Sequence, residues 1–200
     1  MLIVQEITVE LLLSAYANGY FPMASTRNGK EIHWFYPEKR GILPLQGFHT
    51  PKSLNKFIKN NNLYYSVNAC FKEVMTACAE RAEDTWINDE LIGLYCELYK
   101  QGFAHSVECW KDGKLIGGLY GVAIGGAFFG ESMFSRSPNA SKCALVHLVR
   151  LLKDAGYALL DTQYVNDHLK QFGGIEIPRE KYLQMLETAL QVTPEKNCWM

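Results

Sequence analysis

Paired cysteines, long apolar runs and a large net charge are all missing from this chain of 200 residues. The six cysteines form no CxxC pair and do not lie near a histidine at metal-ligand spacing, so a zinc site is not expected. The five histidines show no serine or cysteine partner, which argues against a hydrolytic triad. The cysteines are at positions 70, 78, 96, 109, 143 and 198.

No segment approaches the roughly 20 apolar residues that a membrane-spanning helix needs. The opening residues MLIVQEITVE also lack the basic start and apolar run of a signal peptide. We therefore expect a cytoplasmic protein without a membrane anchor, in which free cysteines act as small apolar residues.

The formal net charge is only −1, so the whole molecule is not a basic nucleic-acid binder. Charge is uneven, however, because the first 60 residues hold seven Lys/Arg against four Asp/Glu, and the remainder holds thirteen against seventeen. This excess indicates either a local phosphate-binding patch or an ordinary solvated face. The basic residues concerned are Arg27, Lys30, Lys39, Arg40, Lys52, Lys56 and Lys59.

A chain of this length, 48% hydrophobic, fits one domain, or one domain with a small appendage. It shows no heptads and no internal repeat, so we expect a monomer. The periodicity predicts helices over residues 8–18, 50–60, 69–81, 88–100, 139–155, 166–172 and 178–191. It predicts strands over residues 32–36, 41–45, 63–68, 106–110, 115–124, 127–134 and 157–163, and irregular structure over 20–23 and 83–86.

This order predicts an α+β fold with one mixed α/β sheet, which matches the general plan of N-acetyltransferase-like (GNAT) domains. Acetyltransferases of that fold hold the pyrophosphate of CoA in a glycine-containing loop. The corresponding residues here, 136–141, contain no glycine, and Pro138 removes a backbone N–H donor. The architecture therefore suggests acyl transfer, and the loop argues against CoA as the donor.

The stretch 115–142 is the most distinctive part of the chain. Gly125 and Gly126 predict a hairpin turn between two apolar runs. Glu131 follows directly on Phe-Phe-Gly, where it faces a cleft, a buried partner or the solvent at a sheet edge.

Many short segments together resemble the leucyl/phenylalanyl-tRNA–protein transferase family, in the family's order and across nearly the whole chain. The matching segments are Tyr16–Pro22, Trp34–Pro37, Thr85–Ile87, Ala104–Glu108, Gly117–Gly121, Phe129–Ser135, Asn139–Lys142, Asp161–Gln163, Asn166–His168 and Glu176–Arg179.

This resemblance implies transfer of Leu and Phe, and less readily Met, from aminoacyl-tRNA to proteins that begin with Arg or Lys, marking them for degradation by the N-degron pathway. It also implies a small N-terminal domain, 1–38, and a GNAT-like catalytic domain, 39–200, with no cofactor and no metal. The alternatives that stay open are a CoA-dependent N-acetyltransferase and a non-catalytic module that binds tRNA or peptide.

The resemblance assigns a catalytic or orienting role to Asp161 and Gln163. They are two residues apart on a predicted strand, so both side chains should face one way. The amide oxygen can then hold the N–H of the attacking amine, and the carboxylate can orient the amide and stabilise the ammonium. The alternative is a buried Asp161 that is hydrogen-bonded to the backbone.

Further substrate-binding residues also follow from the resemblance. Glu131 would contact the substrates, including the cationic end of the acceptor. The 3′ adenosine of tRNA would lie against Trp86, Tyr16, Met23 and Asn166, although many relatives have tryptophan where Met23 stands. The alternative for Trp86 is a side chain that anchors the core. An apolar pocket for the donor side chain, or otherwise plain core packing, is expected from Leu119, Phe128, Gly130, Leu145, Leu148 and Leu160.

Overall fold

The computed structural model describes residues 7–25, 31–80 and 85–199. Its helices are α1 (Val9–Ala17), α2 (Lys52–Asn60), α3 (Phe71–Ala79), α4 (Asp89–Lys100), α5 (Ala140–Asp154), α6 (Asp167–Lys170) and α7 (Arg179–Leu190). Its strands are β1 (Phe21–Ala24), β2 (Ile32–Phe35), β3 (Lys39–Ile42), β4 (Leu63–Val67), β5 (Ala104–Lys111), β6 (Lys114–Ile124), β7 (Ala127–Ser135), β8 (Leu159–Gln163) and β9 (Ile175–Pro178). No helix in this described part of the chain has the length and apolar content that crossing a membrane requires.

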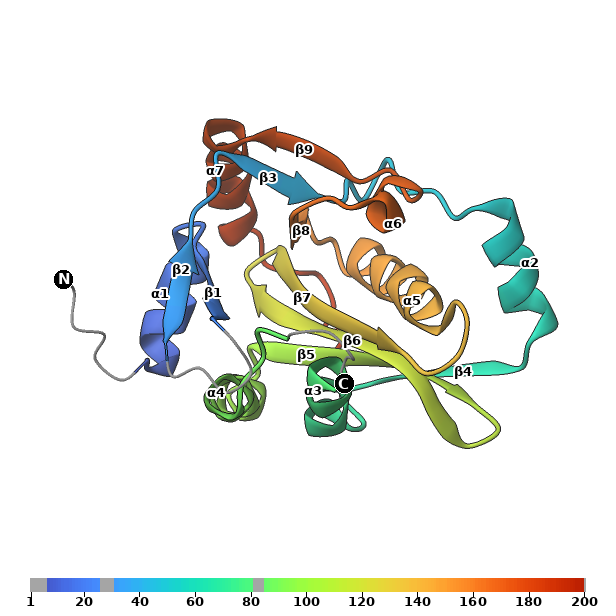
Figure 1. The fold of residues 1–200 in the computed structure, drawn as a ribbon. Coiled ribbons are helices and arrows are strands. Elements are labelled where there is room, and N and C mark those ends of the chain that lie inside the picture. The colour runs from blue at the N-terminus through green and yellow to red at the C-terminus, as the bar shows by residue number, and fades with distance from the viewer. Residues whose placement is uncertain (1–6, 26–30, 81–84, 200) are drawn as a thin grey trace.

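Seven strands form one mixed sheet in the order β4-β5-β6-β7-β8-β3-β9, and β1 and β2 form a separate two-stranded sheet (Figure 1). Neighbours in the large sheet are antiparallel except β7 and β8. The mixed sheet agrees with the predicted fold class. The division of the chain between residues 38 and 39 stays a prediction.

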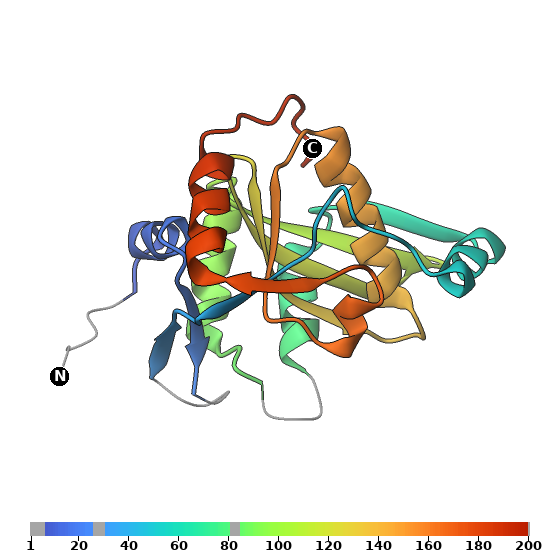
Figure 2. The same ribbon diagram turned by 90° about the horizontal axis from the view of Figure 1, so that it is seen from above.

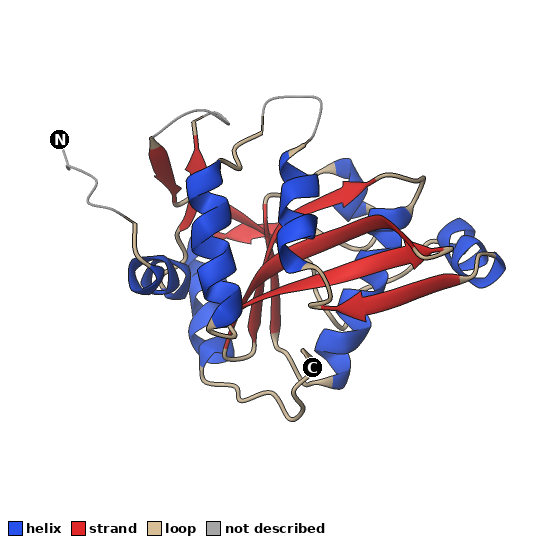
Figure 3. Cartoon of the chain, turned by 90° about the horizontal axis from the view of Figure 1, so that it is seen from below, coloured by secondary structure: helices blue, strands red, loops and turns tan. Residues whose placement is uncertain are grey.

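Helices cover both faces of the large sheet. One apolar cluster joins α1, α3, α4 and α7 to the sheet, and a second joins α2 and α5 to the other face. Seen from above, α5 and α7 lie on either side of β8, and seen from below, α3 and α4 lie side by side across the strands (Figures 2 and 3). The strands between these helices are therefore buried on both faces.

The parallel pair β7–β8 separates partway along its length. Backbone pairing runs from Ala127–Leu159 to Phe129–Asp161, and β7 then continues to Ser135 without β8 as a partner. Beyond Phe129 the two strands leave room between them, because no ladder hydrogen bonds hold them at the usual spacing of about 4.8 Å.

A β-bulge lies at this point of separation. Tyr120 of β6 pairs with Ser132 and Gly121 pairs with Gly130, so that Glu131 is an extra residue in β7. Bulges bend a strand and re-aim the side chain of the extra residue. The bulge accounts for the unusual placement of Glu131 after Phe-Phe-Gly.

Local signals identified several element boundaries correctly. The hydroxyl of Thr8 accepts a hydrogen bond from the backbone of Leu11, and the amide oxygen of Asn88 accepts one from Leu91, as expected for helix caps. Asp112 and Gly113 both have positive φ, which a two-residue hairpin turn requires.

Three sequence-based expectations are wrong. Residues 21–24, expected to be a loop because of Pro22, form strand β1, since β1 has a partner on one side only and proline is tolerated there. Strand β9 was not predicted, because four residues precede a helix without a clear alternation. The helix predicted over residues 69–81 begins at Phe71, because Asn68, which precedes the predicted start, does not cap it; its φ is 59°, and its side chain bonds to His105 and to the carbonyl of Trp199.

The C-terminal segment closes one end of the cluster on the α5 side. Trp199 stacks on His105 with ring centroids 4.2 Å apart, and its indole N–H donates to the hydroxyl of Tyr157 at 2.8 Å. The ring of Phe128 lies 5.3 Å away on the same tryptophan. Burial lowers the pKa of His105 to about 4, so His105 is neutral near pH 7.

We predict that Trp199→Ala lowers the free energy of unfolding by about 2 kcal/mol, below the range for a fully buried tryptophan because Trp199 is only half-buried. Urea denaturation of the two proteins measures this difference, with Trp199→Phe as a milder control. An unchanged midpoint for Trp199→Ala would show that the segment does not contribute to stability.

Candidate active site

A cavity of about 510 Å³ lies where β7 and β8 separate. Its volume is within the range of roughly 300–1,000 Å³ that is typical of small-molecule sites. One side is apolar and is formed by Leu119, Met133, Leu145, Leu148, Leu160 and Leu169. The other side carries polar groups and aromatic rings from Trp86, Glu131, Ser132, Ser141, Thr162, Tyr164, Asn166 and His168.

The structure brings together most of the residues expected for the apolar pocket. Of the six, all except Phe128 line the cavity. Phe128 belongs to the same apolar cluster as Leu119 and Leu145, but its buried ring packs against Trp199. The sequence analysis missed Met133 and Leu169, although Met133 pairs across the ladder with Leu119 and could have been found from that register.

The four residues expected for the adenosine site divide into two pairs. Trp86 and Asn166 line the polar side of the cavity, and the amide oxygen of Asn166 also caps α6. Tyr16 and Met23 are not among the lining residues. Met23 packs in β1 opposite His33, and Tyr16 is fully buried.

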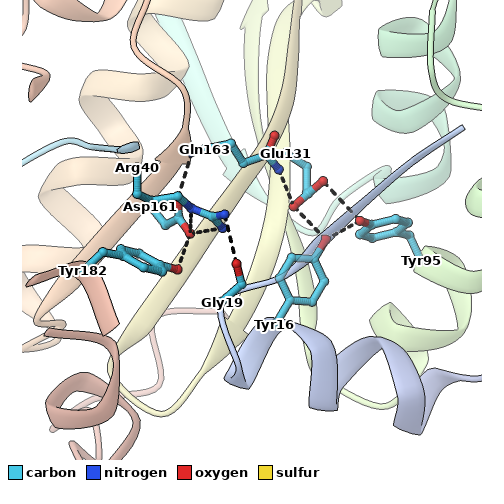
Figure 4. A network of polar contacts seen from close by, with 8 residues as sticks. All are labelled: Tyr16, Gly19, Arg40, Tyr95, Glu131, Asp161, Gln163 and Tyr182. Carbon is cyan, nitrogen blue, oxygen red and sulfur yellow. Dashed lines mark hydrogen bonds and ion pairs between the residues drawn. The ribbon is translucent and has the colours of Figure 1, made fainter. Parts of the chain in front are cut away.

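Glu131 carries the carboxylate of the cavity and receives three side-chain hydrogen bonds (Figure 4). Tyr16 donates its hydroxyl to Oε1 at 2.7 Å, and Tyr95 donates to Oε2 at 3.1 Å. The amide Nε2 of Gln163 donates to Oε1 at 3.0 Å. Tyr16 and Tyr95 also hydrogen-bond to each other. All three donors in Figure 4 are neutral groups, and none of these hydrogen bonds comes from a cation.

Burial is the main influence on the pKa of Glu131, raising it to about 7, although the hydrogen bonds from Tyr16 and Tyr95 act in the opposite direction. Burial likewise raises the pKa values of Tyr16 and Tyr95 well above the ordinary range, so both phenols keep their protons. Near neutral pH, Glu131 is therefore poised between its charged and neutral forms.

Gln163 ends β8 with a φ of 63°, in the left-handed region that residues other than glycine rarely adopt. Because the Glu131 carboxylate needs a donor, the amide N–H₂ faces Glu131 and the amide oxygen faces away from it. Gly41 makes this turn possible, since a Cβ atom there would lie 2.5 Å from the carbonyl carbon of Tyr164.

Asp161 is completely buried, and neither Asp161 nor the nearly buried Gln163 is among the residues that line the cavity. Its Oδ1 accepts the backbone N–H of Gln163 at 2.7 Å, and its Oδ2 accepts the hydroxyl of Tyr182 at 2.6 Å. The carboxylate that orients the Gln163 amide is thus Glu131, and Asp161 holds the backbone instead. The expected regular alternation along β8 ends at Gln163, where the backbone turns left-handed.

Arg40 compensates the buried charge of Asp161. Its NH2 nitrogen lies 2.6 Å from Oδ2, and its Nε donates to both carboxylate oxygens. Burial acts to lower the pKa of Arg40, but the Asp161 carboxylate more than offsets this and the pKa is raised. Arg40 is 1% exposed, so it is not part of a phosphate-binding surface as the charge count suggested.

Of the other residues in the basic excess, Lys39, Lys52, Lys56 and Lys59 are exposed. Arg27 and Lys30 lie outside the described residues. Within the described ranges, no group of three or more His, Cys, Asp or Glu side chains is arranged to hold a metal ion.

Comparisons with known proteins agree over most of the chain. Residues 42–187 match the family leucyl/phenylalanyl-tRNA protein transferase, and residues 5–38 match the N-terminal domain of that family. A leucyl/phenylalanyl-tRNA–protein transferase of Paramagnetospirillum magneticum is 52% identical over 192 residues, covering 94% of this chain and 92% of the relative. One from Salinibacter ruber is 49% identical over 190 residues, covering 95% and 83%.

Among solved structures, FemX superposes with a TM-score of 0.56 at 12% identity, covering 91% of this chain and 73% of FemX. At this identity the likeness concerns the fold alone, and with the mixed sheet it confirms the predicted GNAT-like fold class. The sequence matches carry the assignment further: the chain is a transferase that belongs to the leucyl/phenylalanyl-tRNA–protein transferase family.

Proposed function

We propose that this transferase moves Leu or Phe, and less readily Met, from aminoacyl-tRNA to proteins whose first residue is Arg or Lys. The new N-terminus would mark the acceptor for degradation, and the enzyme would act as a monomer in the cytoplasm. The observation that carries the proposal is one cavity that joins a leucine-rich wall to Glu131, which holds the amide of Gln163.

The donor side chain fits the apolar wall. Leu145 and Leu148 are spaced i, i+3 on α5, which packs on β6 and β7, where Leu119 and Met133 form a cross-strand pair. Flexible side chains of this kind discriminate by only about 1–3 kcal/mol per methylene. Acceptance of Met beside Leu and Phe follows from this limit.

The terminal adenosine fits the polar side of the same cavity. Trp86 offers a ring face, and base stacking of this kind contributes about 1–3 kcal/mol per base. Asn166 uses its amide oxygen to cap α6, so its amide N–H₂ remains for the nucleoside.

The reaction is the aminolysis of an ester. The acceptor nitrogen forms a bond to the carbonyl carbon of the aminoacyl group, and the bond from that carbon to the 3′ oxygen of the tRNA breaks. The amine loses a proton, and the released 3′ oxygen gains one and leaves as a hydroxyl. The amide oxygen of Gln163, which faces away from Glu131, accepts a hydrogen bond from an N–H of the amine and so aligns the amine for attack. Positioning of this kind supplies about 7–11 kcal/mol in favourable cases.

Glu131, and not Asp161, is the carboxylate that interacts with the charge on the attacking amine. Asp161 is sealed by Arg40, Tyr182 and the Gln163 backbone, so it cannot take a proton from the cavity. Glu131 has a pKa of about 7, within about a unit of an α-amine near 8. Its ionised form attracts the ammonium of a cationic acceptor.

The CoA-dependent alternative receives no support from the loop before α5. Besides lacking glycine, this loop has one of its backbone donors in use, because the N–H of Ser141 donates to the hydroxyl of Ser135 at 2.9 Å. Asn139 precedes α5 in the left-handed conformation with no side-chain cap. A pyrophosphate would have to displace the serine hydroxyl.

The body of tRNA would meet the lysine face of α2. Lys52, Lys56 and Lys59 are exposed and spaced i, i+4 and i+7, so they share one side of the helix. The helix contains no acidic residue. Three cations without neighbouring anions favour phosphate contacts.

We predict that Gln163→Ala lowers the single-turnover rate of transfer about 100-fold, with the affinity for charged tRNA nearly unchanged, because a transition-state contact is lost. Rapid quench with Leu-tRNA and an Arg-initiated peptide measures the rate. Gln101→Ala is the matched control, since Gln101 also donates to a glutamate but on the surface of α4. A near-normal rate for Gln163→Ala refutes the assignment.

We predict that the rate rises with pH through about 7 as Glu131 ionises. In Glu131→Gln this limb should disappear, leaving only the limb that belongs to the amine near pH 8. A pH–rate profile of both proteins tests this. Persistence of the limb near 7 in the variant would exclude Glu131 as its source.

Glu131→Gln also separates activity from stability. The folded pKa of about 7 exceeds the ordinary 4.5, so the carboxyl favours folding fully below pH 4.5, and this contribution is lost as the pH rises through 7. We predict that the variant is more stable than the parent by about 3 kcal/mol at pH 8. The difference should shrink toward pH 4.5, as urea titrations at both values would measure. Equal stability at pH 8 would contradict the raised pKa.

We predict that replacing Lys52, Lys56 and Lys59 together by Gln weakens tRNA binding and reduces the slope of log K against log salt by about 2–3. Filter binding over a salt series measures the slope. The control replaces three exposed lysines on other helices, Lys100, Lys153 and Lys181. Equal slopes in the two triple variants would remove α2 from the tRNA interface.

A further inference from the structure

Arg40 lies between the N-terminal residues and the strand that carries Gln163 (Figure 4). Its guanidinium carbon is 4.4 Å from the ring centroid of Phe21 and 4.8 Å from that of Tyr182. Its NH1 nitrogen donates to the carbonyl of Gly19 at 3.1 Å, and Nε and NH2 hold Asp161. The planar group is thus held by two aromatic rings and by hydrogen bonds along its edge.

The contacts of Arg40 lead to the backbone of Gln163. Arg40 sets the position of the Asp161 carboxylate, whose Oδ1 accepts the N–H of Gln163 at 2.7 Å. Gln163 is in the left-handed region, which a residue with a side chain keeps only when its surroundings hold it there. That conformation decides where the amide group is placed beside Glu131.

The N-terminal residues hold this arrangement from both ends. Gly19 and Phe21 contact Arg40 on one side, and the hydroxyl of Tyr16 reaches Glu131 on the other. Gln163 lies between the Arg40–Asp161 pair and Glu131, as Figure 4 shows. The packing of α1 and β1 against the rest of the protein is therefore linked, through these contacts, to the orientation of the Gln163 amide.

We propose that Arg40 is a positioning residue for the transfer reaction, which acts through Asp161 to hold Gln163 in its left-handed conformation and so aims the amide oxygen at the acceptor amine. The proposal rests on the proposed role of Gln163. Arg40 itself touches neither the cavity nor a substrate, since it is buried and absent from the lining residues.

A second arginine provides a matched control within the chain. The guanidinium of Arg179 lies 4.5 Å from the ring centroid of Tyr36 and donates to the carbonyl of Tyr36 at 3.2 Å. It thus makes the same ring and carbonyl contacts as Arg40. Among the described residues, no carboxylate pairs with the Arg179 guanidinium, so its replacement tests the ring and carbonyl contacts without a connection to β8.

The first experiment compares Arg40→Lys with Arg179→Lys. Lysine keeps the charge but cannot reproduce the fork of donors that holds a carboxylate. We expect kcat of Arg40→Lys to fall about 100-fold, with KM for charged tRNA changed less than about 3-fold, because misplacement of a reacting group acts on the chemical step. Arg179→Lys should stay within about 2-fold of the parent.

The second experiment is a double-mutant cycle with Gln163→Ala, which separates positioning from general loss of structure. If Arg40 acts through Gln163, Arg40→Lys should lower kcat less than about 3-fold further when Gln163 is already alanine. If Arg40→Lys does not fold, Tyr182→Phe replaces it in the cycle. That variant keeps the ring beside Arg40 and removes only the hydroxyl bond to Asp161.

The outcomes separate this proposal from the function on which it rests. A normal rate for Gln163→Ala refutes the role of Gln163 and with it the role of Arg40. A slow Gln163→Ala together with a normal Arg40→Lys, or with effects that multiply in the double variant, overturns the Arg40 proposal alone. A slow Arg40→Lys whose effect vanishes in the Gln163→Ala background supports it.

Discussion

The ion pair between Arg40 and Asp161 is the interaction on which the geometry of the site depends. Both groups are almost completely removed from water, and neither would be tolerated there alone. The pair joins the N-terminal residues, β3, β8 and α7, because each contributes a donor, an acceptor or a ring to it. A buried charge pair of this kind does little for stability compared with apolar packing, so its value lies in the fixed orientation that it imposes.

Two carboxylates serve the site, and their surroundings give them different properties. Asp161 has a cation at 2.6 Å and no access to the cavity. Glu131 has only neutral donors, lines the cavity, and has a pKa of about 7. Environments that treat two acids differently allow one to be structural and the other to interact with substrates. Gln163 lies between them. Asp161 accepts a hydrogen bond from its backbone N–H, and Glu131 accepts one from its side-chain amide.

The sequence was sufficient for what depends on local pattern. Periodicity identified the long helices, Gly125 and Gly126 marked the turn between β6 and β7, and the matching segments identified the family. It was not sufficient where contacts join distant residues. Tyr16 is 115 residues from Glu131, and no sequence pattern indicates that its hydroxyl donates a hydrogen bond to that carboxylate. Phe128 packs against Trp199, 71 residues further along the chain, and no local pattern indicates that contact.

The extra residue in β7 has a consequence for how such a crevice can arise in a sheet protein. Because Glu131 lies outside the pairing of Gly121 with Gly130 and of Tyr120 with Ser132, its neighbours on both sides keep regular partners in β6. A single inserted codon can therefore add an acidic group to a closed sheet without disturbing the frame of the residues that follow. In this protein the acidic group proposed to act on the substrates is a residue outside the regular pairing of β6 and β7.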